Sequence, residues 1–234
     1  MPIHIPKYKY ALSHLFEQKL LSIQSEHNGT LEVLLNAGRL RLNTANATYS
    51  FEDKYDAFFD TFKALHFEQR SIGEALILGF GLGSIPVMLQ KNFQQNAHYQ
   101  AVEIDPVIVD LAKQLLDTEI LLQISFFCGD AFAFVQQQAN KPQAQRHQYN
   151  LIAVDIFNDL STPPPFFTEQ FLQPLSQLLS SKGVILFNTL RYDVATSQQS
   201  KAFFKNTFSA VFPNATYINT SGNRVLVFEA IDVP

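Results

Sequence analysis

The chain has 234 residues, 47% of them hydrophobic and 16% charged, which is enough to bury a sizeable core in one large domain or in one domain with a small appendage. A net charge of −4 argues against nucleic acid as an obligate partner, and the single cysteine, Cys128, excludes an internal disulfide and a cysteine metal cluster. The N-terminus resembles no signal or transit peptide, and glycines and Pro86 interrupt the longest apolar stretch, 75–89, so we expect a cytoplasmic chain without a membrane span.

Short segments with strand character fill the beginning of the chain. The runs KLLSIQS, TLEVLLN and GRLRLNT are separated by turn signals at 27–29 and 36–38. They predict a small antiparallel sheet, which we assign to an N-terminal β region over residues 1–53. The next segment, YDAFFDTFKALHF from Tyr55 to Phe67, has apolar residues at helical spacing. We place it at the start of a second domain over residues 54–234.

From residue 74 onward, predicted strands alternate with predicted helices. The strands are expected at 75–79, 98–103, 123–128, 149–155 and 183–189, and the helices at 84–93, 106–116, 130–138, 168–180 and 197–209. Such alternation predicts a parallel sheet with helices on both faces. The segments ATYINT and RVLVFEA flank a turn at 221–223 and predict a terminal hairpin. The expected fold class is therefore α/β, a Rossmann-like seven-stranded, mostly parallel sheet with an antiparallel last strand.

The most informative stretch covers residues 74–106. Its first apolar run ends in a turn that contains Gly79, Gly81 and Gly83, and its second apolar run ends at Glu103. Glycines let the backbone turn tightly and approach a ligand, and a carboxylate at the tip of the next strand can accept hydrogen bonds from both hydroxyls of a ribose. The stretch therefore predicts a nucleoside-cofactor site. A tight turn that only packs a helix on the sheet would need the same glycines.

The sequence lacks the motifs of several other kinds of functional site. Ser84 stands where the dinucleotide fingerprint GxGxxG has its third glycine, and no GK[ST] follows, which disfavours an NAD enzyme and a P-loop. The six histidines show no metal-ligand spacing such as HExxH, so we predict no metal site. No GxSxG elbow is present, so a hydrolase triad is not supported.

The elements VEIDP, GDA and FFTEQF, in this order and spacing, are more specific than the glycine loop. With them the chain resembles the spermidine synthase-like (polyamine aminopropyltransferase-like) branch of the class I S-adenosylmethionine-dependent methyltransferase superfamily, over nearly its whole length. The resemblance implies a β-hairpin domain, a Rossmann-like domain and a homodimer. It also implies S-adenosylmethionine, or decarboxylated S-adenosylmethionine as co-substrate, with no metal.

Position by position, the resemblance gives roles to individual residues. The three glycines would line the donor site, Glu103 would hold the ribose, Ile104 would pack on the adenine face and Asp130 would accept a hydrogen bond from the adenine amino group. Asp155, which ends the fourth strand in AVDIF, would lie at the reaction centre. Each role has a structural alternative, because Asp130 can cap the helix after it, Asp155 can brace its loop and Ile104 can be ordinary core.

Departures from the family pattern bear on the reaction. Aminopropyl-transferring members carry an acid in the glycine loop where this chain has Leu82. They also carry a second acid after the fourth strand, where this chain has Asn158 followed by Asp159. Asn cannot act as a base, and Asp159 can do so only if the loop bulges to present it. Of the tyrosine–histidine–glutamate triplet of the polyamine site, only Tyr55 remains.

A methyltransferase interpretation also lacks an expected acidic residue. Many such enzymes place an acid two residues before the first glycine, where this chain has Ile77, so the methionine tail would need backbone carbonyls or another acid such as Asp53 or Asp56. The loop 157–167, FNDLSTPPPFF, would either cover a substrate or serve as a rigid connector.

We expect methyl transfer from S-adenosylmethionine to a small, unidentified acceptor, with Asp155 beside the reacting atoms and Asp159 as a possible base. Aminopropyl transfer from decarboxylated S-adenosylmethionine is the first alternative. A catalytically silent, dimeric, nucleoside-binding protein is the second. The expected partners are a small-molecule substrate and a second copy of the chain, without nucleic acid or membrane.

Overall fold

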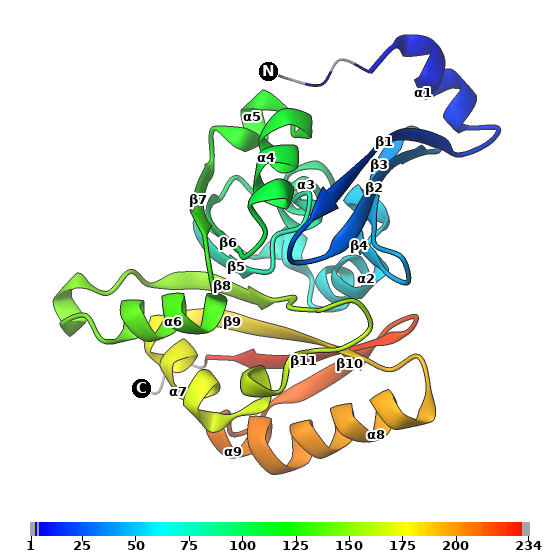
Figure 1. Ribbon diagram of the computed structural model, residues 1–234. Helices are drawn as coiled ribbons and strands as arrows, with labels where there is room; N and C mark the ends of the chain where they lie inside the picture. The colour runs from blue at the N-terminus through cyan, green and yellow to red at the C-terminus, as the bar shows by residue number, and fades with distance from the viewer. Residues whose placement is uncertain (1–2, 4, 231–234) are drawn as a thin grey trace.

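The computed structural model describes residue 3 and residues 5–230, which form two sheets (Figure 1). The four-stranded sheet has the order β1-β2-β3-β4 and is antiparallel throughout. The seven-stranded sheet has the order β10-β11-β9-β8-β5-β6-β7, in which β11 runs antiparallel to both of its neighbours. The predicted fold class is therefore confirmed. The domain boundary at residue 53 remains a prediction.

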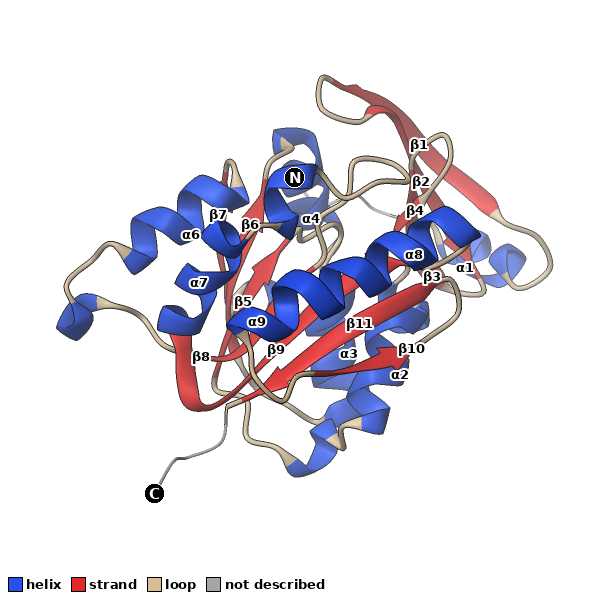
Figure 2. Cartoon of the chain, turned by 90° about the horizontal axis from the view of Figure 1, so that it is seen from below, coloured by secondary structure: helices blue, strands red, loops and turns tan. Residues whose placement is uncertain are grey.

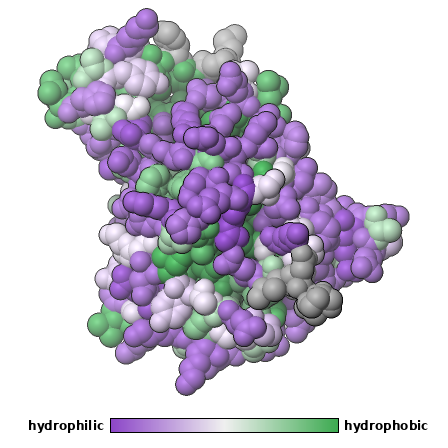
Figure 3. Space-filling view, turned by 180° about the vertical axis from the view of Figure 1, so that it is seen from behind, coloured by the Kyte–Doolittle hydropathy of each residue, from purple (hydrophilic) through white to green (hydrophobic). Residues whose placement is uncertain are grey.

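The N-terminal elements are α1 (Lys7–Ser13), β1 (Gln18–Ser25), β2 (Gly29–Asn36), β3 (Arg39–Asn43) and β4 (Thr48–Ser50). Three of the strands follow the predicted runs, whereas the short α1 and the three-residue β4 were not predicted. Hydrophobic side chains gather where α1 lies, at the end of the molecule seen at the upper left of Figure 3. Among them, Tyr8, Leu15 and Phe16 are exposed.

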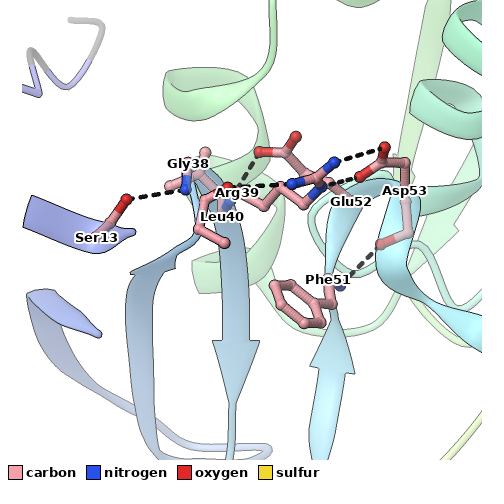
Figure 4. Close-up of polar contacts among 9 residues, drawn as sticks. Ser13, Gly38, Arg39, Leu40, Phe51, Glu52 and Asp53 are labelled. Atoms are coloured by element: carbon pink, nitrogen blue, oxygen red, sulfur yellow. Dashed lines mark hydrogen bonds and ion pairs between the residues drawn. The ribbon is translucent and has the colours of Figure 1, made fainter. Parts of the chain in front are cut away.

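A short 3-10 turn, Glu52–Lys54, connects the N-terminal sheet to α2 (Asp56–Ala64). The Arg39 guanidinium forms an ion pair with Asp53, and the Leu40 amide donates to the Glu52 carboxylate at 2.7 Å (Figure 4). These contacts hold the turn against β3. The helix α2 ends earlier than the predicted Phe67 because His66 adopts a left-handed conformation, with φ of 52°.

The elements of the second sheet follow the predicted alternation. They are β5 (Glu74–Leu78), α3 (Ser84–Phe93), β6 (His98–Glu103), α4 (Pro106–Leu115), α5 (Thr118–Leu121), β7 (Ile124–Cys128), α6 (Ala131–Ala139), β8 (Tyr149–Val154), α7 (Glu169–Leu178), β9 (Leu179–Leu190), α8 (Val194–Phe203), α9 (Ser209–Val211), β10 (Thr216–Asn219) and β11 (Asn223–Glu229). Between α8 and α9 lies a π-helical turn, Phe204–Phe208. The strand β9 begins four residues earlier than expected, directly after α7.

Helices cover both faces of the seven-stranded sheet (Figure 2), and a hydrophobic core lies on each face. The first joins the inner face of the N-terminal sheet, at Leu31 and Val33, to α2, α3 and α4. The second lies under α6, α7 and α8 and is rich in phenylalanine. Because both faces of the sheet are covered, the carboxyl ends of its parallel strands, below the N-terminal sheet, are where an open α/β sheet leaves room for a ligand.

Candidate functional site

A cavity of about 530 Å³ opens at the carboxyl ends of β5, β6, β7 and β8. Its walls come from the β1–β2 turn, β4, the glycine loop and the segments that follow β6, β7 and β8. Pro163, Pro165 and Phe166 of the proline-rich loop belong to the lining, so this loop does face the cavity. The volume lies in the range of small-molecule sites in proteins, which is roughly 300–1,000 Å³.

The glycine loop lies at the base of this cavity. Gly79 has φ of 84°, and a Cβ placed on it would collide with the carbonyl oxygen of Asp155. A side chain there would push the ends of β5 and β8 apart, so the position requires glycine. Gly81 also lines the cavity, whereas Gly83 does not and instead begins α3 as its N-cap residue.

Glu103 holds the glycine loop in place. Its Oε2 atom accepts hydrogen bonds from the Phe80 and Gly81 amides at 3.1 and 3.2 Å, and its Oε1 atom accepts from the Asp105 amide at 3.1 Å. Burial raises the pKa of the Glu103 carboxyl, and the three amides oppose that rise. A carboxylate offers about four acceptor sites, so one remains for a ligand. Glu103 lines the cavity, and its structural role was not foreseen.

Ile104 and Asp130 flank the same wall. Ile104 is 45% exposed and lines the cavity, so it is not the ordinary core residue that the sequence left open. Asp130 is the N-cap of α6, where its Oδ1 atom accepts from the Ala133 amide at 2.7 Å. Its side chain also lines the cavity. Because the cap uses one oxygen, capping and ligand binding are compatible.

Asp155 is half-buried on the other side of the cavity. Its Oδ1 atom accepts from the Tyr55 hydroxyl at 3.1 Å and from the Asn188 amide at 2.8 Å. Asn223 in turn donates to the Asn188 carbonyl oxygen at 3.0 Å, which fixes the orientation of that amide. Burial raises the pKa of Asp155 to about 7, against the two hydrogen bonds that lower it. This carboxyl therefore exchanges its proton near neutral pH.

Asp159 does not come to the cavity. Its carboxylate accepts from the Thr44 hydroxyl at 2.8 Å and from the Asn46 amide at 2.7 Å, and its own amide donates to the Tyr49 hydroxyl at 2.6 Å. The backbone at Asp159 is left-handed, with φ of 52°, and turns the side chain toward the β3–β4 loop. The hypothesis that Asp159 serves as the base is therefore not supported, since the loop does not present it.

The other acids considered for the donor tail are also unavailable. Leu82 is 6% exposed and packs in the first core, so its side chain does not face the cavity as the family pattern implied. Asp53 is engaged by Arg39, and Asp56 is not among the lining residues. Ser84 bonds to the Ser50 hydroxyl at 2.7 Å and accepts from the Phe51 amide at 3.0 Å. In place of a third glycine, Ser84 thus ties β4 to the glycine loop.

Sequence reasoning missed the contribution of the N-terminal sheet to the cavity. His27 and Asn28 in the β1–β2 turn, together with Tyr49 in β4, line it. The fully buried Asp105 accepts from the Ser25 hydroxyl and from the Asn28 amide, and so fastens this turn to the start of α4. The sequence signal that could have indicated this contact was Asp105, the acid directly before Pro106, which also caps α4.

Metal-binding clusters and membrane-spanning helices are both absent from residue 3 and residues 5–230. No group of three or more His, Cys, Asp or Glu side chains in this range is arranged to hold a metal ion. Within the same range, none of the helices has the length and apolar character needed to cross a membrane.

Comparison with known families identifies the class of protein. The family model described as the spermine/spermidine synthase domain matches residues 65–231, which is more than half of the chain. The chain therefore belongs to the spermine/spermidine synthase family.

Relatives of two activities are similar to the chain. The polyamine aminopropyltransferase of Vibrio vulnificus is 31% identical over 159 residues, which cover 68% of this chain and 51% of that protein. The N-terminal histidine N-methyltransferase of Emericella nidulans is 35% identical over 144 residues, covering 59% and 23%. The eEF1A lysine and N-terminal methyltransferase of Homo sapiens is 30% identical over 144 residues, covering 59% and 20%. The match thus spans about half of the first relative and less than a quarter of the other two.

Solved structures share the fold. A spermidine synthase in complex with the transition-state analogue AdoDATO superposes with a TM-score of 0.67 at 16% identity, covering 93% of this chain and 75% of the other. Human methyltransferase-like protein 13 in complex with SAH superposes with a TM-score of 0.57 at 24% identity, covering 71% and 75%. The fold is therefore one that methyltransferases and aminopropyltransferases have in common.

Proposed function

We propose that the protein is a transferase that binds S-adenosylmethionine in this cavity and transfers its methyl group to a small acceptor. The observation that carries the proposal is that Glu103, Ile104 and Asp130, at the ends of the neighbouring strands β6 and β7, line one cavity with Asp155, which follows β8 on the other side of β5. An acid for the ribose, an apolar surface for the adenine and an acid for its amino group suit one adenosine moiety.

Methyl transfer from S-adenosylmethionine requires few catalytic groups from the protein. The sulfonium is already activated, so most of the catalysis consists of holding the acceptor in line with the methyl group and excluding water. An acceptor that loses a proton needs a base nearby. Asp155 suits this task, because its pKa is about 7 and its Oδ2 atom has no partner among the described residues. Tyr55 and Asn188 hold the carboxyl by its other oxygen.

Methyl transfer is favoured over aminopropyl transfer by the distribution of acids. Decarboxylated S-adenosylmethionine carries a terminal amine, and a polyamine acceptor adds further cationic groups. Leu82 lies in the core, and Asp53 and Asp159 are bound to the N-terminal sheet. Asp155 is left as the acid beside the reacting atoms. A single carboxyl is poorly matched to two cationic groups.

Aminopropyl transfer is the second candidate, and the charge of the cavity favours it. Glu103, Asp130 and Asp155 are acidic, whereas the lining residues in the described part of the chain include neither lysine nor arginine. Such a lining attracts cationic ligands. The similarity to the Vibrio vulnificus aminopropyltransferase points the same way.

The two reactions leave different products, which separates them in one experiment. The protein is incubated with a mixture of small amines and either S-adenosylmethionine or its decarboxylated form, and the products are analysed by mass spectrometry. We expect S-adenosylhomocysteine and an acceptor heavier by one methyl group from the first donor. Methylthioadenosine formed only from the second donor would replace our proposal with aminopropyl transfer. Binding of a donor without any product would indicate a silent nucleoside-binding protein.

A further inference from the structure

Tyr49 presents a hydroxyl proton to the cavity. Its oxygen accepts the Asp159 amide at 2.6 Å, so its own proton must be donated elsewhere. None of the described residues accepts it. Burial raises the pKa of Tyr49, so the phenol stays protonated at neutral pH. Tyr49 lines the cavity, so this proton is available to a ligand bound there.

Tyr49 lies near both ends of the site. Negative charge on Glu103 contributes to the raised pKa of Tyr49, and Tyr49 contributes to the raised pKa of Tyr55, which bonds to Asp155. The backbone of Tyr49 is beside the glycine loop, since a Cβ on Gly81 would come within 3.1 Å of its carbonyl oxygen. A donor whose ribose is at Glu103 and whose sulfonium is near Asp155 extends its tail through this region.

Asn158 supplies a second donor in the same corner. It directly precedes the residue that Tyr49 binds, its backbone pairs with Ser161, and its exposed side chain lines the cavity. Within residues 5–230, its side-chain amide has no hydrogen-bond partner. With neither lysine nor arginine in the described lining, these two neutral donors are suited to an anionic oxygen.

We propose that Tyr49 and Asn158 bind the carboxylate of the methionine tail and thereby select S-adenosylmethionine over its decarboxylated form. This inference rests on the proposed function, because it assumes that an adenosyl donor occupies the cavity. It assigns the donor specificity to the N-terminal sheet and to the loop that follows β8. The two donor molecules differ only in the carboxylate, so their relative affinity reports on this contact directly.

The test is calorimetric titration of the wild-type chain, Tyr49→Phe and Asn158→Asp with each of the two donors. Tyr49→Phe should weaken S-adenosylmethionine binding about tenfold, the equivalent of one hydrogen bond to a charged group, and leave the decarboxylated form within about twofold. Asn158→Asp places a negative charge beside the carboxylate and should reverse the preference. Asp at this exposed position should not disturb folding, so it serves even if Tyr49→Phe is unstable.

Asn46→Ala is the matched control, because it loosens the turn around Asp159 without removing the Tyr49 hydroxyl. It should leave the affinity ratio of the two donors unchanged. If the affinity ratio of the two donors were unchanged in both Tyr49→Phe and Asn158→Asp, and the protein still bound S-adenosylmethionine, this inference would be overturned while the proposed function would stand. Equal loss of both donors in Tyr49→Phe and Asn46→Ala would also overturn it. A wild-type chain that binds neither donor would instead refute the proposed function.

Discussion

The raised pKa of Asp155 predicts how the free energy of unfolding depends on pH. The carboxyl titrates near pH 7 in the folded protein because burial penalises its charge, whereas its ordinary pKa is 3.8. As the pH rises from about 4 to about 7, the unfolded chain releases this proton and the folded chain retains it. The free energy of unfolding therefore falls over this range and then levels off. At 1.36 kcal/mol per pH unit, the full cost of charging Asp155 in the fold is at most about 4 kcal/mol.

Asp155→Asn removes the titration and preserves the acceptor for Tyr55 and Asn188. We expect this variant to gain stability relative to the wild type as the pH rises, with the difference widening by about 2–3 kcal/mol between pH 5 and pH 8. Urea unfolding followed by circular dichroism at both pH values measures it. Asp60→Asn, at an exposed position of α2, is the matched control for replacing a carboxylate with an amide. A pH-independent difference for Asp155→Asn would refute the reasoning.

Three further predictions concern the site and its frame. Gly79→Ala should lower the free energy of unfolding by about 3 kcal/mol or more, because the new Cβ meets the Asp155 carbonyl at a positive φ. Gly222→Ala, at φ of 76° in open space, should lower it by only about 1–2 kcal/mol. Equal losses of stability in thermal unfolding would contradict the packing argument. Asp130→Asn should keep the helix cap and lose about tenfold in affinity for adenosyl compounds, and unchanged affinity would remove the adenine role. Asn188→Ala removes a donor that favours ionised Asp155, so the midpoint of the pH–rate profile should move to higher pH; an unmoved midpoint would show that Asn188 does not tune this carboxyl.

The sequence predicted the central frame well because local signals agreed there. The strands around Ala75, His98 and Tyr149 are largely apolar segments bounded by turns, so their positions were predicted to within one or two residues. Since parallel strands end at one edge of the sheet, the strand pattern alone places Glu103 and Asp155 close together. Both do line the cavity. The roles of the site residues remain predictions.

The sequence was less informative where the position of a side chain depends on a single loop residue or on a distant partner. The left-handed turn at Asp159 directs its side chain to Thr44 and Asn46, and no pattern near residue 159 indicates this. Alignment with a family motif placed Leu82 at the donor tail, but the loop turns that side chain into the core. The contacts of Tyr49 and Asn188 were not predicted because they join segments that lie far apart in the sequence.

The most direct measurement is a crystal structure of the protein soaked with S-adenosylhomocysteine. Our account predicts the adenosine at the carboxyl ends of β6 and β7, a ribose hydroxyl donating to the free acceptor site of the Glu103 carboxylate, and the adenine amino group beside Asp130. A compound bound elsewhere, or a Glu103 side chain that contacts only the glycine-loop amides while the ribose lies away from it, would contradict the account.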